Sequence, residues 1–212
     1  MNCIRKNLYQ FSQYRREINI SDHQYLLMCS RPMLIYTGTH AAAEATLPEI
    51  EKLLDGRELS CIFVSHTGAD ECGGLSVILE RYPHAQVICS EHTARQLEGF
   101  GIPGEFCVTR PGMKYAGDDY ELQFVEYPSD SHLLPGLLMY ETKSGVFFSS
   151  DLMMRAGDGA GKTTHSTWKD EVHATNVRQV PNLAMVHQLR KDLMKLSPDF
   201  VAVGHGYCMI MD

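Results

Sequence analysis

Hydrophobic residues in the first half of the chain fall into short apolar runs separated by segments with helical spacing. The runs that predict strands are residues 33–36, 61–64 and 86–89. Helical patterns cover residues 41–54, 75–82 and 91–100. Such an alternation predicts parallel strands with helices packed outside them. Residues 3–30 come first, and their β-prone segments are typical of an antiparallel start.

The second half of the chain has the pattern of an antiparallel sheet followed by one helix and one strand. Strand patterns cover residues 120–127, 136–141 and 145–149, a helical pattern covers 183–196, and a last strand is expected at 201–203. The Gly-rich segment 155–162 is expected to be an exposed loop near the site entrance. Two halves, each with strands inside and helices outside, predict one α/β domain over residues 1–212, built as a four-layer αββα sandwich.

Composition narrows the classes of partner and the compartment. The 212 residues are 44% hydrophobic, which supports a sizeable core, and the net charge of −7 without a basic run gives little support to a nucleic-acid or membrane partner. No apolar run approaches the roughly 20 residues of a membrane span, and no leader pattern follows Met1, so a cytoplasmic protein is expected. Seven scattered cysteines without a Cys-x-x-Cys pair indicate neither a disulfide framework nor a thiolate zinc cluster.

Polar side chains that can bind metal follow four of the predicted strands. They are His66, Asp70, Glu71, His132, Asp151 and His205. Three imidazoles and three carboxylates are enough to hold two metal ions bridged by one carboxylate. Each also has an ordinary alternative, because acidic residues favour helix starts and a histidine after a strand is often a hydrogen-bonded loop residue. The coincidence of four such placements favours the metal site.

These motifs resemble the metallo-β-lactamase superfamily, and most closely the diiron module of flavodiiron proteins. The segment from His66 to Leu75 is similar to the flavodiiron loop His-Thr-Glu-Pro-Asp-His, and the similarity continues through Ser90. His132 lies eight residues before Tyr140, which matches the family's spacing, and Ser149-Ser150-Asp151 matches its bridging aspartate. The resemblance covers residues 33 to 207 and implies the four-layer metallo-β-lactamase fold.

Two positions depart from the family pattern. Gly68 stands where the family has a Glu or His ligand, and Glu71 stands where it has the second His of the loop. Carried over residue by residue, the resemblance implies one ion held by His66, His132 and Asp151, and another held by Asp70, Glu71, Asp151 and His205. The first ion then lacks a protein ligand, so water, an exogenous ligand or a neighbouring side chain must complete it.

The resemblance implies two iron ions as cofactor, with zinc or manganese as alternatives. Flavodiiron enzymes draw electrons from an FMN domain, and none is expected here, because only a few residues follow His205 in the sequence. The first expectation is therefore similarity to stand-alone diiron proteins that bind dioxygen as a peroxo-type adduct and act as an oxygen sensor in chemotaxis. A chemoreceptor or other signalling protein is the expected partner, and the oligomeric state stays open, with a homodimer as one option. Tyr36 and Tyr207, both at strand ends, are candidates for stabilising an oxygen adduct.

Three other functions stay open at this stage. One is a hydrolase of the same superfamily that uses zinc or manganese to activate water. Another is a flavodiiron-type oxygen or nitric oxide reductase fed by a separate electron donor. The third is a degenerate domain retained only for protein interactions, which the losses at the metal loop would favour.

Overall fold

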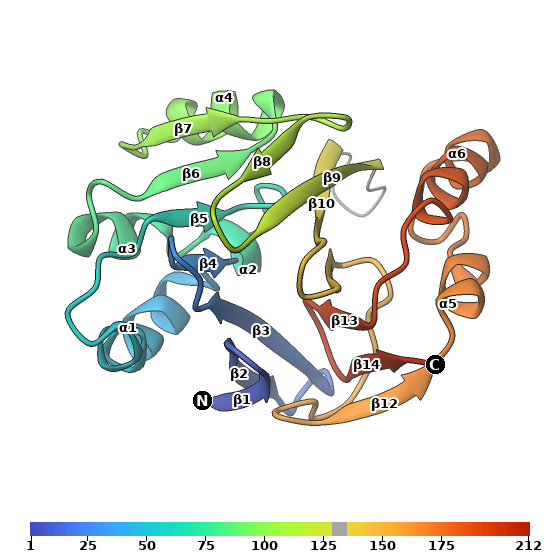
Figure 1. The fold of residues 1–212 in the computed structure, drawn as a ribbon, viewed down its shortest axis with the longest axis horizontal. Coiled ribbons are helices and arrows are strands. Elements are labelled where there is room, and N and C mark those ends of the chain that lie inside the picture. Colours follow the sequence, from blue (N-terminus) through green and yellow to red (C-terminus); the bar gives the residue numbers. More distant parts are fainter. Residues whose placement is uncertain (129–134) are drawn as a thin grey trace.

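Two seven-stranded sheets form the centre of the computed structural model, which describes residues 1–128 and 135–212 (Figure 1). The first sheet contains, in spatial order, β1 (Asn2–Arg5), β2 (Leu8–Arg15), β3 (Ile20–Leu27), β4 (Met33–Ile35), β5 (Cys61–Phe63), β6 (Gln86–Cys89) and β7 (Glu105–Val108). The second contains β12 (Thr163–Ser166), β14 (Cys208–Met211), β13 (Phe200–Val203), β11 (Val146–Ser150), β10 (Pro135–Glu141), β9 (Glu121–Pro128) and β8 (Lys114–Ala116).

The register follows the predicted change from antiparallel to parallel pairing. Strands β1 to β4 pair antiparallel, and β4 to β7 pair parallel. In the second sheet β11 pairs parallel with β13, whereas β8 to β11 form an antiparallel meander. Strands β5, β11 and β13 end near one another, because His66, Asp151 and His205, which follow them, lie within 3.5 Å of each other in pairs through Asp151.

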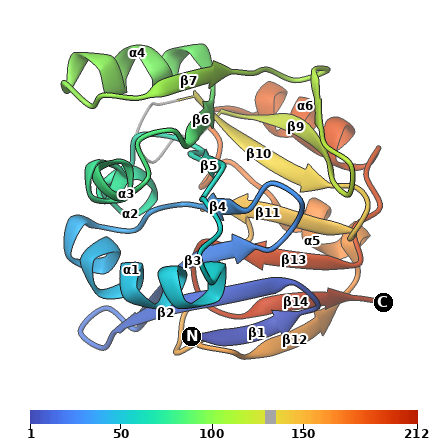
Figure 2. The same ribbon diagram turned by 60° about the vertical axis from the view of Figure 1, so that its left-hand side comes forward.

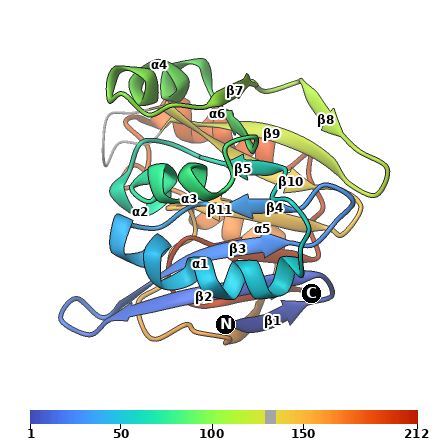
Figure 3. The ribbon, with the colours of Figure 1, turned by 90° about the vertical axis from the view of Figure 1, so that its left-hand side faces the viewer.

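Helices cover the outer faces of both sheets. Helices α1 (His40–Leu54), α3 (Leu75–Arg81) and α4 (Glu91–Gly99) lie outside the first sheet, and α5 (Trp168–Ala174) and α6 (Leu183–Leu193) lie outside the second (Figures 2 and 3). Thr39, Ser90 and Asn182 cap three of these helices, because each side chain accepts a hydrogen bond from a backbone N–H in the first turn. The four-layer prediction is confirmed.

Aromatic side chains pack across the space between the two sheets. Phe63 stacks on Phe124 with ring centroids 6.1 Å apart, and Tyr25 meets Phe148 edge-on at 5.9 Å. Such pairs contribute to stability beyond the area they bury, and all four rings belong to one buried cluster. This shared core fixes the sheets relative to one another, and with them the strand ends that carry the site.

Among the described residues, no helix combines the length and apolar character needed to cross a membrane.

Several short strands were not predicted, and the expectation of an exposed loop at 155–162 needs a correction at its centre. The segment 155–162 is not simply an exposed loop: the Gly157 N–H donates to the Asn19 carbonyl at 2.7 Å, and the buried Gly159 N–H donates to Ser21 Oγ at 2.8 Å. A side chain at Gly159 would overlap the Gly206 carbonyl, so the glycine serves close packing rather than exposure. Strands β7, β8 and β12 were missed because they are edge strands with weak apolar alternation, and β14 follows the strand expected to be last.

Candidate metal centre

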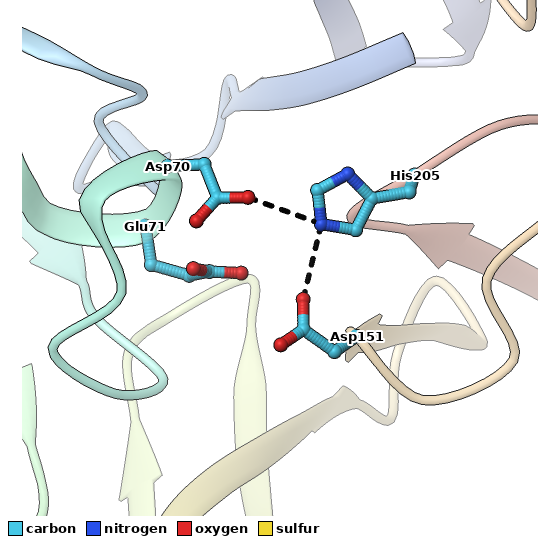
Figure 4. A group of neighbouring side chains, drawn as sticks. All are labelled: Asp70, Glu71, Asp151 and His205. Atoms are coloured by element: carbon cyan, nitrogen blue, oxygen red, sulfur yellow. Dashed lines mark hydrogen bonds and ion pairs between the residues drawn. The ribbon is translucent and has the colours of Figure 1, made fainter. Parts of the chain in front are cut away.

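Three strand ends and one short helix meet at the edge of the sandwich. His66 follows β5, Asp151 follows β11 and His205 follows β13, while Asp70 and Glu71 belong to α2 (Ala69–Cys72). Figure 4 shows Asp70, Glu71, Asp151 and His205 turned toward one another, and one ligand atom of each lies within 4.8 Å of the others. Residues far apart in the sequence thus converge as the prediction required.

Unusual backbone conformations place these groups. Ser150 has φ +47° at a register irregularity between β11 and β13, and this turn directs Asp151 into the site. Tyr36 has φ +61°, and its hydroxyl accepts a hydrogen bond from the Ser150 N–H at 2.9 Å. A Cβ at Gly204 would lie 2.8 Å from the Ser150 carbonyl, so only glycine allows this close approach. Left-handed non-glycine residues of this kind cluster at functional sites.

The donor atoms divide into two sets that share Asp151. His205 Nε2 lies 3.0 Å from Asp151 Oδ1 and 3.3 Å from Asp70 Oδ2. His66 Nε2 lies 3.5 Å from Asp151 Oδ2 and 3.5 Å from Glu71 Oε2. Two donors that each lie about 2.1 Å from one ion are separated by about 3.0 to 3.4 Å at octahedral or tetrahedral angles. The spacing therefore suits two metal positions, with one Asp151 oxygen facing each.

Neighbouring side chains orient the donor residues through hydrogen bonds to the atoms that face away from the candidate metal positions. Asp22 Oδ1 accepts a hydrogen bond from His205 Nδ1 at 3.0 Å and is itself paired with Arg15 at 2.7 Å. A carboxylate on the far nitrogen of a ligating histidine fixes the ring and raises its basicity. On the other side, Ser150 Oγ donates to Glu71 Oε1 at 3.1 Å and lies 3.0 Å from Ser65 Oγ, which contacts His66 Nδ1 at 3.1 Å. Both sets are thus oriented by buried hydrogen bonds.

Without a cation, the cluster carries an excess of buried negative charge. Burial, followed by repulsion from Asp151 and Asp70, raises the pKa of Glu71 well above its usual range. Burial opposes the charged form of His205, but hydrogen bonds to Asp151, Asp22 and Asp70 outweigh it and raise its pKa to about 12. Glu71 Oε2 is buried and accepts no hydrogen bond from the part of the chain that the structure describes. These residues fit a cationic group, since a metal would satisfy that oxygen and balance the carboxylates.

Comparison with known proteins places this geometry in a family. The family model described as "ODP family beta lactamase" matches residues 20–206. The chain belongs to this family. The resemblance found in the sequence is thereby confirmed, and the ODP family's metallo-β-lactamase-like fold agrees with the two sheets and their flanking helices.

Individual relatives of this ODP-family chain include proteins with different names. An anaerobic nitric oxide reductase flavorubredoxin from Vibrio vulnificus is 25% identical over 210 residues, covering 92% of this chain and 41% of that protein. A hydroxyacylglutathione hydrolase from Synechococcus sp. is 30% identical over 156 residues, covering 71% of this chain and 58% of that protein. The chain therefore spans well under two thirds of the length of these curated relatives.

Solved structures confirm the fold. The metal-soaked Flv1 flavodiiron core from Synechocystis sp. superposes with a TM-score of 0.79 at 19% identity, covering 96% of this chain and 54% of that one. The flavodiiron protein from Giardia intestinalis gives a TM-score of 0.75 at 14% identity, covering 97% and 54%. At these identities the likeness concerns the arrangement of the chain.

The remaining predicted site residues of this ODP-family chain fall in different places. Tyr36 lies directly behind the donors, through its contact with Ser150. The Tyr207 ring packs on Gly157, where an added Cβ would lie 2.9 Å from Cε2, and no hydrogen bond among the described residues links it to the donors. His132 lies outside the described residues, so its assignment stays a prediction.

Asp22 and Ser150 were missed as supporting residues, because the burial that gives Asp22 its role is visible only in the structure. The run Ser21-Asp22-His23-Gln24 is polar but wholly buried in β3, and a buried polar run usually serves a hydrogen-bond network. The buried His23 ring is held by Ser12 Oγ at 2.8 Å and the Gly206 carbonyl at 2.6 Å, beside the loop that carries His205. The first sheet thus supports His205, a candidate ligand that follows a strand of the second sheet.

The opening above the donors is small. A cavity of about 240 Å³ lies over Asp70, Asp151 and His205. Its other described lining residues are Arg15, Ile20, Tyr127, Met154, Arg178 and Gln179. Sites for drug-sized ligands usually measure about 300 to 1,000 Å³, so this opening suits a smaller ligand.

Proposed function

We propose that this chain is a non-haem diiron protein that binds dioxygen and serves as an oxygen sensor. The observation that carries the proposal is the division of donors into two sets around Asp151, with Oδ1 toward His205 and Oδ2 toward His66. A pair of ferrous ions bound there would supply electrons and open coordination positions for dioxygen. His66, Asp70, Glu71, Asp151 and His205 would hold the pair, together with His132.

The donor set consists of nitrogen and oxygen atoms only, which supports a non-haem iron site rather than a metal site with thiolate ligands. Cys72 is the cysteine nearest the donors in sequence, and burial, followed by repulsion from Glu71 and Asp70, raises its pKa to about 12. Its thiol therefore stays protonated at neutral pH and is a poor ligand. Zinc and manganese accept the same donors, so the flavodiiron relatives supply the preference for iron.

The protein's own contribution is to orient donors and limit access. His66 and Glu71 are almost completely buried, and the cavity of about 240 Å³ leaves room for a diatomic ligand more readily than for a bulky thioester. Burial raises the pKa of Tyr36 well above its usual range, so its hydroxyl keeps its proton. Because that hydroxyl oxygen already accepts from the Ser150 N–H, the proton is available to a neighbouring acceptor in the site.

Two other functions have support among the relatives. The flavorubredoxin relative favours a reductase of oxygen or nitric oxide fed by a separate electron donor, and the hydroxyacylglutathione hydrolase relative favours a metallohydrolase. For the sensor, a signalling protein such as a chemoreceptor is the proposed partner, and the proposed location is the cytoplasm.

Iron loading under anaerobic conditions, followed by air, separates these functions. A sensor should take up about two iron ions per chain and develop a visible absorption band that decays slowly without added reductant. Rapid repeated oxygen or nitric oxide consumption with an artificial electron donor would favour the reductase instead. A colourless iron-loaded protein, or thioester hydrolysis by the zinc-loaded protein, would overturn the sensor proposal.

A further inference from the structure

Gly68 is a glycine for reasons of space and not of backbone conformation. It precedes α2 with φ −63° and ψ 147°, which any residue can adopt. A Cβ built at this position would overlap Glu71 Oε2, and it would lie 2.8 Å from His66 Nε2 and 3.2 Å from Asp70 Oδ1. The room for a side chain at position 68 is therefore the room that the Glu71 carboxylate now occupies.

The Glu71 carboxylate is buried and aimed at the His66 side of the site. The backbone N–H of Glu71 donates to the Gly68 carbonyl at 3.1 Å, and this tight turn places the Glu71 side chain next to Gly68. Ser150 Oγ holds Oε1 at 3.1 Å, which leaves Oε2 facing His66 Nε2 at 3.5 Å. A buried carboxylate oxygen that accepts no hydrogen bond within 1–128 and 135–212 is costly unless a cation lies beside it.

We propose that Glu71 supplies the ligand that Gly68 cannot, for the metal position beside His66. The inference rests on the proposed dinuclear site and deepens it. One position is then built by His66, Glu71 and Asp151, and the other by Asp70, Asp151 and His205, with His132 outside this assignment. Gly68 and Glu71 are thus coupled: because position 68 has no side chain, the Glu71 carboxylate can occupy the space beside His66.

The competing assignment places Glu71 with His205, as transfer from the family motif had implied. That assignment also fits the distances, because a Glu71 carboxylate oxygen lies within 4.8 Å of ligand atoms of Asp70, Asp151 and His205. The two assignments predict different results when Glu71 is removed together with one histidine. If Glu71 and His66 serve the same ion, losing both should cost no more metal than losing one.

Metal counting on double variants tests the assignment. Each variant is dialysed with Mn(II), and bound metal is measured by mass spectrometry, with circular dichroism as a check on folding. The wild type should hold about two ions, Glu71→Ala about one, Glu71→Ala with His66→Ala still about one, and Glu71→Ala with His205→Ala about none. Glu71→Gln, which keeps the side-chain shape, replaces Glu71→Ala if the alanine variants do not fold.

Different outcomes overturn different statements. If the double variant with His205→Ala keeps one ion while that with His66→Ala keeps none, Glu71 serves the other position and the inference is wrong. Two ions in Glu71→Ala would also overturn it, while leaving the dinuclear site intact. A wild type that binds no metal would instead refute the dinuclear site on which the inference rests.

A pair of glycine variants tests the steric part separately. Gly68→Ala should push the Glu71 carboxylate aside and weaken binding of one Mn(II) ion by about tenfold or more. Gly99→Ala is the matched control, since an added Cβ there meets nothing within 4 Å and should leave both affinities unchanged. Equal affinities in Gly68→Ala and the wild type would contradict the proposed coupling between Gly68 and Glu71.

Discussion

Replacing Asp22 by asparagine should weaken one metal position without contacting metal. Asp22 Oδ1 accepts the His205 Nδ1 proton at 3.0 Å, and the Asp22 side chain is only 9% exposed. Asparagine keeps the shape of the side chain but removes the charge that stabilises the ring. His205 would therefore be a poorer donor at Nε2, the atom that faces Asp151 and Asp70.

The size of the effect follows from the hydrogen bond that is weakened. A buried hydrogen bond to a charged group contributes about 1.5 to 3 kcal/mol, which corresponds to a tenfold to hundredfold change in affinity. Loss of the carboxylate behind a ligating histidine changes metal affinity by about 10- to 100-fold in other proteins, which agrees. Asp22→Asn should lower the affinity for one ion by this amount and leave the other nearly unchanged.

Calorimetric titration of metal-free protein with Zn(II) or Mn(II) measures both affinities. The matched control is Asp212→Asn, because Asp212 pairs with His165 at a similar 2.9 Å but both side chains are more than half exposed. That variant should bind metal like the wild type. Affinities within threefold of the wild type in Asp22→Asn would refute the assigned role of Asp22, as would an equal loss in Asp212→Asn.

Three further perturbations follow from the same structure. Asp151→Ala should reduce bound metal below about one ion per chain, because Asp151 faces both donor sets, and metal analysis checks it. Burial, the largest cause, lowers the pKa of His23 to about 4, below 6.5 in the unfolded chain, so the metal-free protein should lose up to about 3 kcal/mol of stability as the pH falls from 6.5 to 4. Urea unfolding should show this loss in the wild type and much less of it in His23→Gln. An unfolding free energy that changes equally with pH in both proteins would contradict the prediction. Phe148→Ala should lower the unfolding free energy by about 3 to 5 kcal/mol in the same assay, since the ring is fully buried against Tyr25; a loss below about 1 kcal/mol would contradict that packing.

Much of the fold could be predicted because its central strands are buried on both faces. The runs at 33–36, 61–64 and 86–89 are apolar apart from Gln86, and the structure places strands within each of them. Edge strands carry no such signal: Thr163–Ser166 contains no aliphatic residue and pairs on one side only. The burial of Gly159 within the loop 155–162 was not predicted, because glycine marks both exposed turns and close backbone packing, and only the three-dimensional structure distinguishes them.

The convergence of donors could be predicted from their positions after strands, but their division into two sets could not. His66, Asp70, Glu71, Asp151 and His205 come together as expected. Which carboxylate faces which histidine depends on side-chain direction in the short helix α2 and on the left-handed turn at Ser150. Neither feature has a sequence signature, since serine seldom adopts positive φ. For the same reason, the sequence could not show that Glu71 lies in the space next to Gly68.

The most direct test of the central claim is Mössbauer spectroscopy of wild-type protein loaded anaerobically with ⁵⁷Fe(II). Two donor sets that share Asp151 predict about two iron ions per chain, which become an exchange-coupled pair after exposure to air. Protein that retains only isolated, uncoupled iron, or no iron above the background of Asp151→Ala, would contradict the claim that these residues form one dinuclear centre.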